Sequence, residues 1–337
     1  MTGYDTLARL VTPPTVPVDA RGDWNAAETA VGVRLPDDYK WLVATYGWGE
    51  FCDLLYLHTP FGPSRHNGIE WQGAHPSESA DRGGERYPYP LHPAPGGLLI
   101  WGTTMDADRL CWLTDGEPEE WPVVVWSSEG WYETHRTGAA GFVEGWAGGR
   151  VHSRLLGAMD LDLAPWFNTF RPRVDRCLVL SEGPLPHDER LSRLRTALAP
   201  TTDRGAWRSE RDGSGQDHFA TLDADWLLTY DTPHPHQIRI AFPPEDTERV
   251  RHRLFAAAEL MGCRVLEVTT AAGTPLETWD AVTDEDEWPG VRGVLAGGGG
   301  AGVARLTGKS NIHSDGLSTA ETLVEAHCQW QALASVT

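Results

Sequence analysis

The sequence predicts an α+β protein: an antiparallel sheet flanked by helices, followed by a second α+β domain. Near the N-terminus, two short amphipathic helical patterns precede a series of short apolar strand patterns, and a further helical pattern follows them. The order helix, helix, strands, helix is typical of an α+β domain with an antiparallel sheet. After residue 175 a strand–helix–strand rhythm restarts, which predicts a second sheet with its own helices.

The first two helices are expected within residues 24–46. Asp23 is a suitable N-cap for the first of them, because its side chain can accept hydrogen bonds from the first backbone N–H groups. Pro36 can begin the second helix, since its fixed φ suits the first turn. Gly47 is expected to end it, because glycine adopts a left-handed conformation at little cost.

The remaining elements of the first half are short. A Pro-, Gly-, Ser- and His-rich stretch at 60–97 predicts a long surface excursion, and a closing helix is expected at 139–147. The predicted strands are bounded by Gly, Pro or Asp, and they lie at residues 52–57, 98–101, 109–113 and 122–126.

The second half begins after a connector. The predicted division is a first domain at 1–150, a connector at 151–175 and a second domain at 176–337. The ferredoxin-like arrangement is one candidate fold for the second domain. Strands are expected at 177–180, 218–222, 226–230, 236–242 and 263–268, helices at 188–198, 245–261 and 318–333, and a glycine hinge at 297–300.

Charge limits the classes of partner. The chain has 337 residues, with 48 acidic against 28 basic side chains and a formal net charge of −20. Such a protein should be repelled by nucleic acid and by anionic membranes, and attracted to basic partners. With no signal peptide and no apolar run long enough to span a membrane, we expect a cytoplasmic protein. Five widely spaced cysteines without a CxxC pair favour neither a disulfide framework nor a zinc site.

The stretch from Trp24 to Phe51, WNAAETAVGVRLPDDYKWLVATYGWGEF, resembles the SMI1/KNR4 (SUKH) family signature. The strand pair within 95–126 and the helix at 142–146 also resemble the family's later elements. The resemblance covers roughly residues 5–150. It implies a SUKH-like domain with one sheet flanked by helices, and a binding role without an active site. The matching signature positions are Gly32, Leu35, Pro36, Asp38, Tyr39, Lys40, Tyr46, Gly47 and Gly49. Of these, Leu35, Pro36, Tyr39, Gly47 and Gly49 are expected to serve the fold rather than a ligand.

The densest acidic stretch, residues 106–133, is the candidate partner-binding region. It has a single basic residue, Arg109, and four interleaved tryptophans. Carboxylates beside aromatic side chains would suit a basic protein partner, because charge accelerates association and aromatic anchors give affinity. The alternative is that the acids are solvated turns and the tryptophans point inward. The candidate residues are Asp106, Asp108, Trp112, Asp115, Glu117, Glu119, Glu120, Trp121, Glu129 and Trp131.

No catalytic, metal or cofactor site is predicted. The histidines lack the short ligand spacings of zinc sites, and no GxSxG motif occurs. The resulting hypothesis is a non-enzymatic immunity-type protein that binds a basic toxin domain, such as a nuclease, and occludes its active site. The alternatives are a regulatory scaffold with several weaker partners, and an adaptor domain fused to an uncharacterised enzyme domain. The partner, the binding face, the oligomeric state and the role of the second domain are not specified by the sequence.

Overall fold

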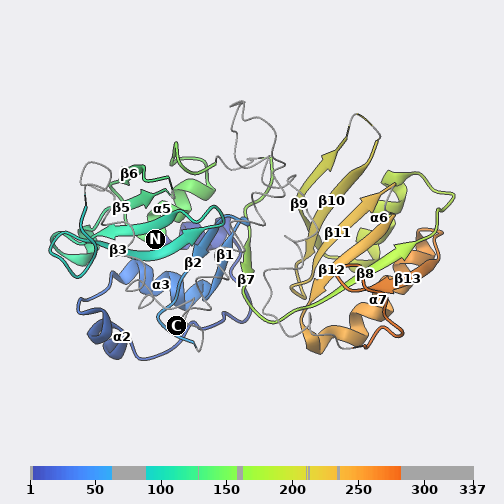
Figure 1. The fold of residues 1–337 in the computed structure, drawn as a ribbon, viewed down its shortest axis with the longest axis horizontal. Helices are drawn as coiled ribbons and strands as arrows, with labels where there is room; N and C mark the ends of the chain where they lie inside the picture. Colours follow the sequence, from blue (N-terminus) through green and yellow to red (C-terminus); the bar gives the residue numbers. More distant parts are fainter. Residues whose placement is uncertain are drawn as a thin grey trace. The chain divides into compact units, whose positions relative to one another are not determined.

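The computed structural model describes residues 3–62, 89–127, 129–157, 162–209, 211, 213–233 and 236–281. The chain divides into two compact units, Met1–Phe170 and Arg171–Thr337. Each unit contains its own antiparallel sheet, of seven strands in the first and six in the second (Figure 1). The predicted glycine hinge, the predicted helix at 318–333 and most of the 60–97 excursion lie outside the described residues.

The helices of the first unit begin and end where the sequence signals indicate. The Asp23 carboxylate accepts hydrogen bonds from the backbone N–H groups of Asn25 and Ala26, and Gly32 ends the same helix at φ 84°. A helix that the sequence analysis did not predict, α1, packs against the closing helix α5. The described helices are α1 (Gly3–Leu10), α2 (Trp24–Val31), α3 (Asp37–Tyr46) and α5 (Ala139–Ala147).

The first sheet has the strand order β6-β5-β4-β3-β2-β1-β7. Its strands are β1 (Gly49–Phe51), β2 (Leu55–Leu57), β3 (Leu98–Thr104), β4 (Arg109–Leu113), β5 (Val123–Trp126), β6 (Tyr132–His135) and β7 (Phe167–Thr169). The sequence analysis did not predict β1, β6 and β7, and residues 52–54 of its predicted strand at 52–57 form the β1–β2 turn instead. β7 lies within the 151–175 segment and pairs with β1 along its whole length.

The core of the first unit is an aromatic layer between the sheet and helices α3 and α5. Trp112 packs edge-on against Tyr39 of α3, with ring centroids 4.9 Å apart, and Trp101 contacts Phe142 of α5. The opposite face of the sheet has a smaller apolar cluster that includes Ile100 and Cys111. The sheet is therefore apolar on both faces near its centre, which explains why β5 is buried at every position.

The second unit has the strand order β13-β8-β12-β11-β10-β9. In a ferredoxin-like βαββαβ domain the first strand lies between the third and the fourth. Here β8 lies between β12 and β13, two helices provide the crossovers, and β10 and β9 extend the sheet beyond β11. The elements are β8 (Val174–Leu180), α6 (His187–Leu198), β9 (Thr201–Arg208), β10 (Gly215–Thr221), β11 (Leu227–Thr232), β12 (Gln237–Phe242), α7 (Thr247–Leu260) and β13 (Val265–Thr269).

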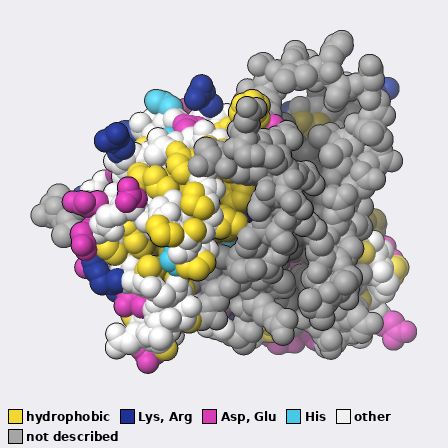
Figure 2. Space-filling model, turned by 60° about the vertical axis from the view of Figure 1, so that its left-hand side comes forward, with side chains coloured by type: hydrophobic (Ala, Val, Ile, Leu, Met, Phe, Trp, Pro, Cys, Tyr) yellow, Lys and Arg dark blue, Asp and Glu magenta, His cyan; other side chains and the backbone are white. Residues whose placement is uncertain are grey.

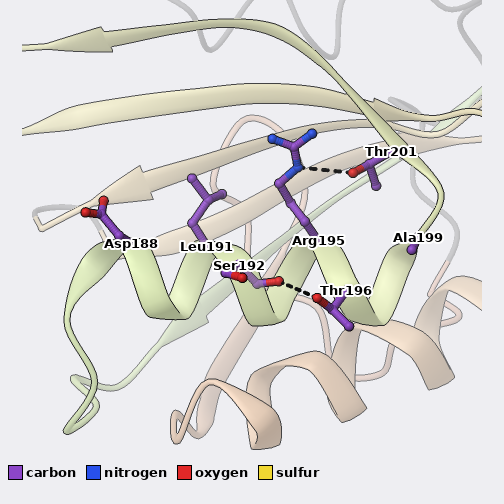
Figure 3. Close-up of a pocket in the computed structure, with 7 residues that line it drawn as sticks. All are labelled: Asp188, Leu191, Ser192, Arg195, Thr196, Ala199 and Thr201. Atoms are coloured by element: carbon purple, nitrogen blue, oxygen red, sulfur yellow. Dashed lines mark hydrogen bonds between the residues drawn. The ribbon is translucent and has the colours of Figure 1, made fainter.

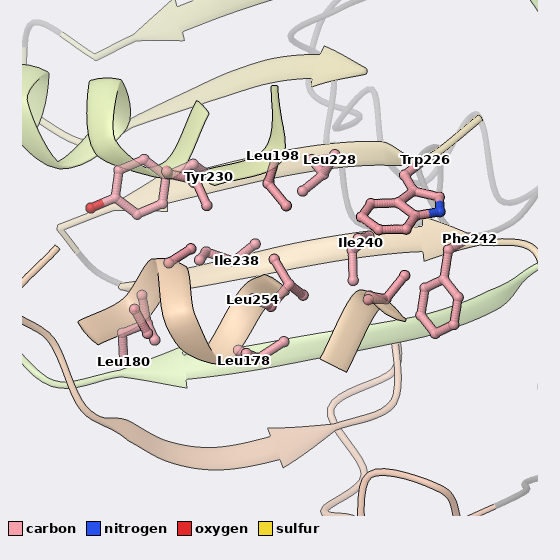
Figure 4. Close-up of a cluster of buried hydrophobic side chains, with 14 of the residues drawn as sticks. Leu178, Leu180, Leu198, Trp226, Leu228, Tyr230, Ile238, Ile240, Phe242 and Leu254 are labelled. Carbon is pink, nitrogen blue, oxygen red and sulfur yellow. The ribbon is translucent and has the colours of Figure 1, made fainter. Parts of the chain in front are cut away.

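One apolar cluster holds the second unit together. Side chains from β8, β10, β11 and β12 meet those of α6 and α7, so both helices cover the same face of the sheet (Figure 4). Leu254 of α7 is fully buried against Leu178, Ile238 and Ile240 in this cluster. Because the cluster is continuous, its burial stabilises both helices on the sheet.

Replacement of Leu254 by alanine should destabilise the second unit by about 2–5 kcal/mol, because it removes buried methyl groups and leaves a cavity. Leu260 lies on the same helix but is 50% exposed, and its replacement by alanine should cost less than about 1 kcal/mol. Thermal unfolding of the full chain followed by circular dichroism checks this difference. Equal losses in the two variants would contradict the described orientation of α7.

Candidate protein-binding surface

Two ion-paired side chains join helices α2 and α3 at the Leu-Pro turn of the signature. The Glu28 carboxylate accepts a hydrogen bond from the backbone N–H of Leu35 at 2.9 Å. The Lys40 ammonium lies 2.6 Å from the same carboxylate. Glu28 thus binds a backbone amide of the turn and the Lys40 ammonium at the same time. Burial raises the pKa of Glu28, but the contacts with Lys40 and Leu35 outweigh this effect, so the pKa is lowered. The signature lysine therefore orders the turn between the two helices.

Asp38, the signature aspartate, caps a different helix. Its carboxylate accepts a hydrogen bond at 2.9 Å from the backbone N–H of Ala140, in the first turn of α5. A Cβ at Gly138 would lie 2.3 Å from the same carboxylate, so only glycine leaves room for it there. Burial raises the pKa of Asp38, and the hydrogen bond from the Ala140 N–H partly offsets this rise. This contact ties α3 to α5 across about one hundred residues of sequence.

The other signature residues predicted to be structural also have defined contacts. Tyr39 is fully buried, and its hydroxyl donates a hydrogen bond to the His58 carbonyl at 2.8 Å. Leu35 is buried beside it, and Pro36 occupies the N-cap of α3. Gly47 has φ 70°, and a Cβ there would meet the Val18 carbonyl oxygen at 2.2 Å. At Gly49, a Cβ would meet the Asn168 carbonyl oxygen at 2.3 Å, so the pairing of β1 with β7 requires glycine.

Replacement of Asp38 by alanine should destabilise the first unit by about 1 kcal/mol, because the first turn of α5 loses its acceptor. The matched control is Asp37→Ala, since Asp37 is the neighbouring acid but has a largely exposed side chain. That variant should change the free energy of unfolding by less than about 0.5 kcal/mol. Chemical denaturation of both full-length variants measures the difference. A loss for Asp38→Ala no larger than that for Asp37→Ala would show that α5 does not depend on this cap.

The predicted acidic stretch does not form one surface, because its turns lie at opposite ends of the first sheet. The β1–β2, β3–β4 and β5–β6 turns share one end, as the register pairs Phe51 with Leu55, Leu55 with Thr104, and Trp126 with Tyr132. We call this the hairpin end. The β4–β5 connection lies at the other end, and β4 separates the two by roughly 17 Å at about 3.4 Å per residue.

Glu119 belongs to the end opposite the hairpins and contributes to the fold. It pairs with Arg34, and its carboxylate lies 3.4 Å from the backbone nitrogen of Asp37, in the first turn of α3. A carboxylate at that position is favoured by the helix dipole. The three other acids of this connection, Asp115, Glu117 and Glu120, are exposed.

Three of the candidate contact residues are buried, and this corrects the predicted set. Trp112 is in the aromatic core, 6.2 Å from Trp121 between ring centroids, and Trp121 donates a hydrogen bond from its indole N–H to the Gly116 carbonyl. Asp108 is only 6% exposed. Trp112 lies on β4, which needs large apolar side chains on its helix-facing side, and Trp121 in the β4–β5 connection packs against Trp112. These three residues cannot contact a partner in the described conformation.

The hairpin end combines an exposed indole with exposed carboxylates. Trp131 is 66% exposed, and its turn is closed by hydrogen bonds to the Ser127 hydroxyl and from the Ser127 backbone N–H. Glu129 lies in the same turn and is exposed. Asp106 lies in the neighbouring β3–β4 turn, which is fixed by bonds to the Thr104 hydroxyl. Two strand spacings place the two turns about 10 Å apart.

A further acid at this end was missed by the sequence analysis. Asp53 lies in the β1–β2 turn, where it accepts hydrogen bonds from the Trp166 indole at 3.1 Å and the Asn168 amide at 2.8 Å. Burial raises the pKa of Tyr56 well above its ordinary value, and the charges of Glu50, Asp53 and Asp106 raise it further. These carboxylates, far apart in sequence, therefore act on one region. The residues of the three turns are 52–54, 105–108 and 127–131, and no Lys or Arg occurs among them.

Arg109, which directly follows the β3–β4 turn in sequence, is stacked on the sheet. Its guanidinium lies 4.4 Å from the ring centroid of Trp126, which in turn stacks on Tyr132. In Figure 2 hydrophobic side chains gather in the centre of the visible described surface, and Asp and Glu side chains lie toward its left-hand edge. Lys and Arg side chains also lie at the edges of this face, so the figure shows an apolar centre with charged side chains of both signs around it.

His58 connects the signature helix to the sheet and gives the first unit a pH dependence. Its ring lies 3.1 Å from the Thr103 hydroxyl, and burial lowers the pKa of His58 to about 4. In the unfolded chain its pKa is about 6.5, so between pH 6.5 and 4 the unfolded state binds a proton that the folded state does not. His58 therefore favours the folded state fully above pH 6.5, and this stabilisation falls as the pH drops toward 4.

Wild-type protein should lose up to about 3 kcal/mol more stability between pH 7 and pH 4.5 than a His58→Gln variant, which has no titrating ring. Thermal unfolding of both full-length proteins across this range measures the difference. As a control, His152 is a further histidine of this unit, and His152→Gln should retain the wild-type pH dependence. Parallel curves for wild type and His58→Gln would show that this ring is accessible to protons in the folded state.

Within the described residues, no group of His, Cys, Asp and Glu side chains is arranged to hold a metal ion. The four described cysteines are unbridged and buried, and burial raises the pKa of Cys111 to about 12 and of Cys177 to about 11. None of the helices in the described part of the chain has the length and apolar character needed to span a bilayer.

Comparison with known proteins identifies the first unit. Residues 21–142 match the family model described as SUKH_6: SMI1-KNR4 cell-wall. The N-terminal part of the chain is an SMI1-KNR4 domain. The match includes the α2–α3 signature, the sheet from β1 to β6 and the start of α5, which are the elements joined by Glu28, Asp38 and Tyr39. Searches of curated proteins and of solved structures found no match.

Proposed function

We propose that the protein is a non-enzymatic, immunity-type binder in which the SMI1-KNR4 domain neutralises a basic toxin domain, such as a nuclease, by covering its active site. The family favours an immunity-type or related protein. The observation that carries the finer proposal is the hairpin end, where Trp131 is exposed beside Asp106 and Glu129. In this proposal the binding surface lies within 1–150, the predicted connector at 151–175 also adds β7 to the first sheet, a second domain lies at 176–337, and the complex forms in the cytoplasm.

Charge would bring the partner to this surface. The chain has a net charge of −20, and the hairpin turns contain acids without Lys or Arg. A basic nuclease domain has a positive surface where it binds phosphates, so the two fields would attract before contact. The same acidic surface would repel nucleic acid. Once bound, the protein would occupy the phosphate-binding site of the toxin, so that nucleic acid could not enter it.

Trp131 would provide the affinity. A tryptophan that enters a pocket on the partner buries a large apolar ring, and such residues dominate binding energies at interfaces. The turn that carries it is closed by hydrogen bonds through Ser127, so little conformational freedom would be lost on binding. Glu129 and Asp106 would then face basic side chains at the rim of the contact.

The first test is capture of the partner from lysate of the native host, washed at increasing salt. A single basic protein with toxin-like catalytic activity should be retained, and addition of the full chain should inhibit that activity. The interaction should weaken with salt but persist, because part of it is apolar. Recovery of many proteins that are all lost at moderate salt would instead indicate a scaffold.

Affinity for that partner should fall about 100-fold in the triple variant Asp106→Lys, Glu129→Lys, Trp131→Ala, because it loses the anchor and reverses two charges. The matched control is Glu117→Lys with Glu120→Lys at the opposite end of the sheet. It changes the net charge by the same amount but should weaken binding less than about threefold. Titration calorimetry measures both, and an equal loss in the control would place the contact elsewhere.

A further inference from the structure

A groove runs along one side of α6 in the second unit. The α6 residues that line the groove recur every three or four positions, so they form one stripe along the helix. Thr201, at the start of β9, lies opposite the C-terminal end of α6 (Figure 3). The groove encloses about 480 Å³ and is open to solvent. The residues that line it are Asp188, Leu191, Ser192, Arg195, Thr196, Ala199 and Thr201.

This side of α6 is only partly used for packing: Leu191 is half-buried against the core, whereas Asp188, Ser192 and Thr196 are exposed. Arg190, Leu194 and Leu198 point into the core and are buried. On the flank next to α7, Arg193 pairs with Glu189 and donates a hydrogen bond to the Leu260 carbonyl. The groove stripe therefore lies on the flank away from α7, alongside the last strand of the sheet.

That strand, β9, is at the edge. It pairs with β10 on one side and is the terminal strand of the sheet order, and each of its eight residues is exposed or half-buried. An edge strand offers backbone N–H and C=O groups to a further strand. A helix beside such an edge provides a wall for the side chains of the added segment, an arrangement that many peptide-binding domains use.

The chemistry of the groove indicates the kind of segment that fits. Arg195 pairs with Asp203 of β9 and donates a hydrogen bond to the Thr201 hydroxyl at 3.1 Å, so its charge is balanced within the unit. Among the described residues, the Asp188 carboxylate forms no ion pair and is exposed at the mouth of the groove. The remaining lining is short or aliphatic, with the Leu191 side chain half-buried between the helix and the sheet.

We propose that this groove binds an extended, basic segment of a partner protein, which adds to β9 as a further strand. A Lys or Arg of the segment would face Asp188, and aliphatic side chains would lie against Leu191 and Ala199. The site is separate from the hairpin end and does not depend on the function proposed for the SMI1-KNR4 domain. A partner with a basic tail could contact both sites, and two linked contacts bind more tightly than either alone.

The test uses the full chain and a fluorescent ten-residue peptide of alternating Lys and Val, which favours an extended conformation, at about 150 mM salt to screen long-range attraction. Anisotropy should show saturable binding, and hydrogen exchange should show new protection of β9 amides. A Glu–Val peptide should not bind. Failure of the Lys–Val peptide to bind, or protection outside β9, would overturn the proposal.

Variants on the two flanks of α6 separate the groove from general charge. Asp188→Lys should weaken peptide binding about tenfold, whereas Glu189→Lys, with the same charge change on the adjacent residue, should change it less than twofold. Ser192→Trp fills the groove from an exposed position and should abolish binding without altering the circular dichroism spectrum. Equal effects of the Asp188 and Glu189 changes would overturn the proposal. So would a wild-type dimer that Ser192→Trp dissociates, since a second copy would then occupy the groove.

Discussion

In an antiparallel sheet each strand reverses the direction of the one before it, and this constraint decides which loops of the first unit can meet. The turns after β1, β3 and β5 share the hairpin end, whereas the β4–β5 connection lies at the other. A stretch of sequence that looks like one acidic surface is thereby divided in two. The same reversal brings Asp53 close to Asp106, although more than fifty residues separate them.

The signature residues maintain that sheet through three contacts of different chemistry. Glu28 orders the turn between α2 and α3 by binding Lys40 and an amide of Leu35. Asp38 caps α5, and Tyr39 packs on Trp112 while its hydroxyl binds the chain after β2. These contacts hold α3 and α5 on one face of the sheet.

The two proposed binding surfaces would recognise their partners in different ways. The hairpin end offers an aromatic side chain and carboxylates on closed turns, which suits a folded basic surface. The α6 groove lies beside an edge strand, which suits an extended segment. Both favour basic partners, in keeping with a net charge of −20. The buried pair of Asp231 with Arg239 on the outer face of the second sheet is balanced internally and does not add to this attraction.

The sequence by itself determined the local elements and the family. Helical spacing with Asp23, Pro36 and Gly47 as boundaries predicted α2 and α3, because caps and breakers act on neighbouring residues. The predicted ranges of α5, β4 and α7 also agree with the structure, because local sequence signals mark these elements too. The short strands β1, β6 and β7, and the longer edge strand β9, were not predicted, because they exist through pairing with other strands rather than through strong alternation of their own.

Only the tertiary structure decided which candidate residues can act. Periodicity could not show that Trp112 and Trp121 point toward the helices while Trp131 points to solvent, since all three are tryptophans among acids. Nor could spacing show that Glu119 serves the start of α3 or that Asp53 joins the hairpin end. Local sequence specifies how a segment folds, but register and sheet order specify which segments share a surface, and those depend on contacts between residues far apart in the chain.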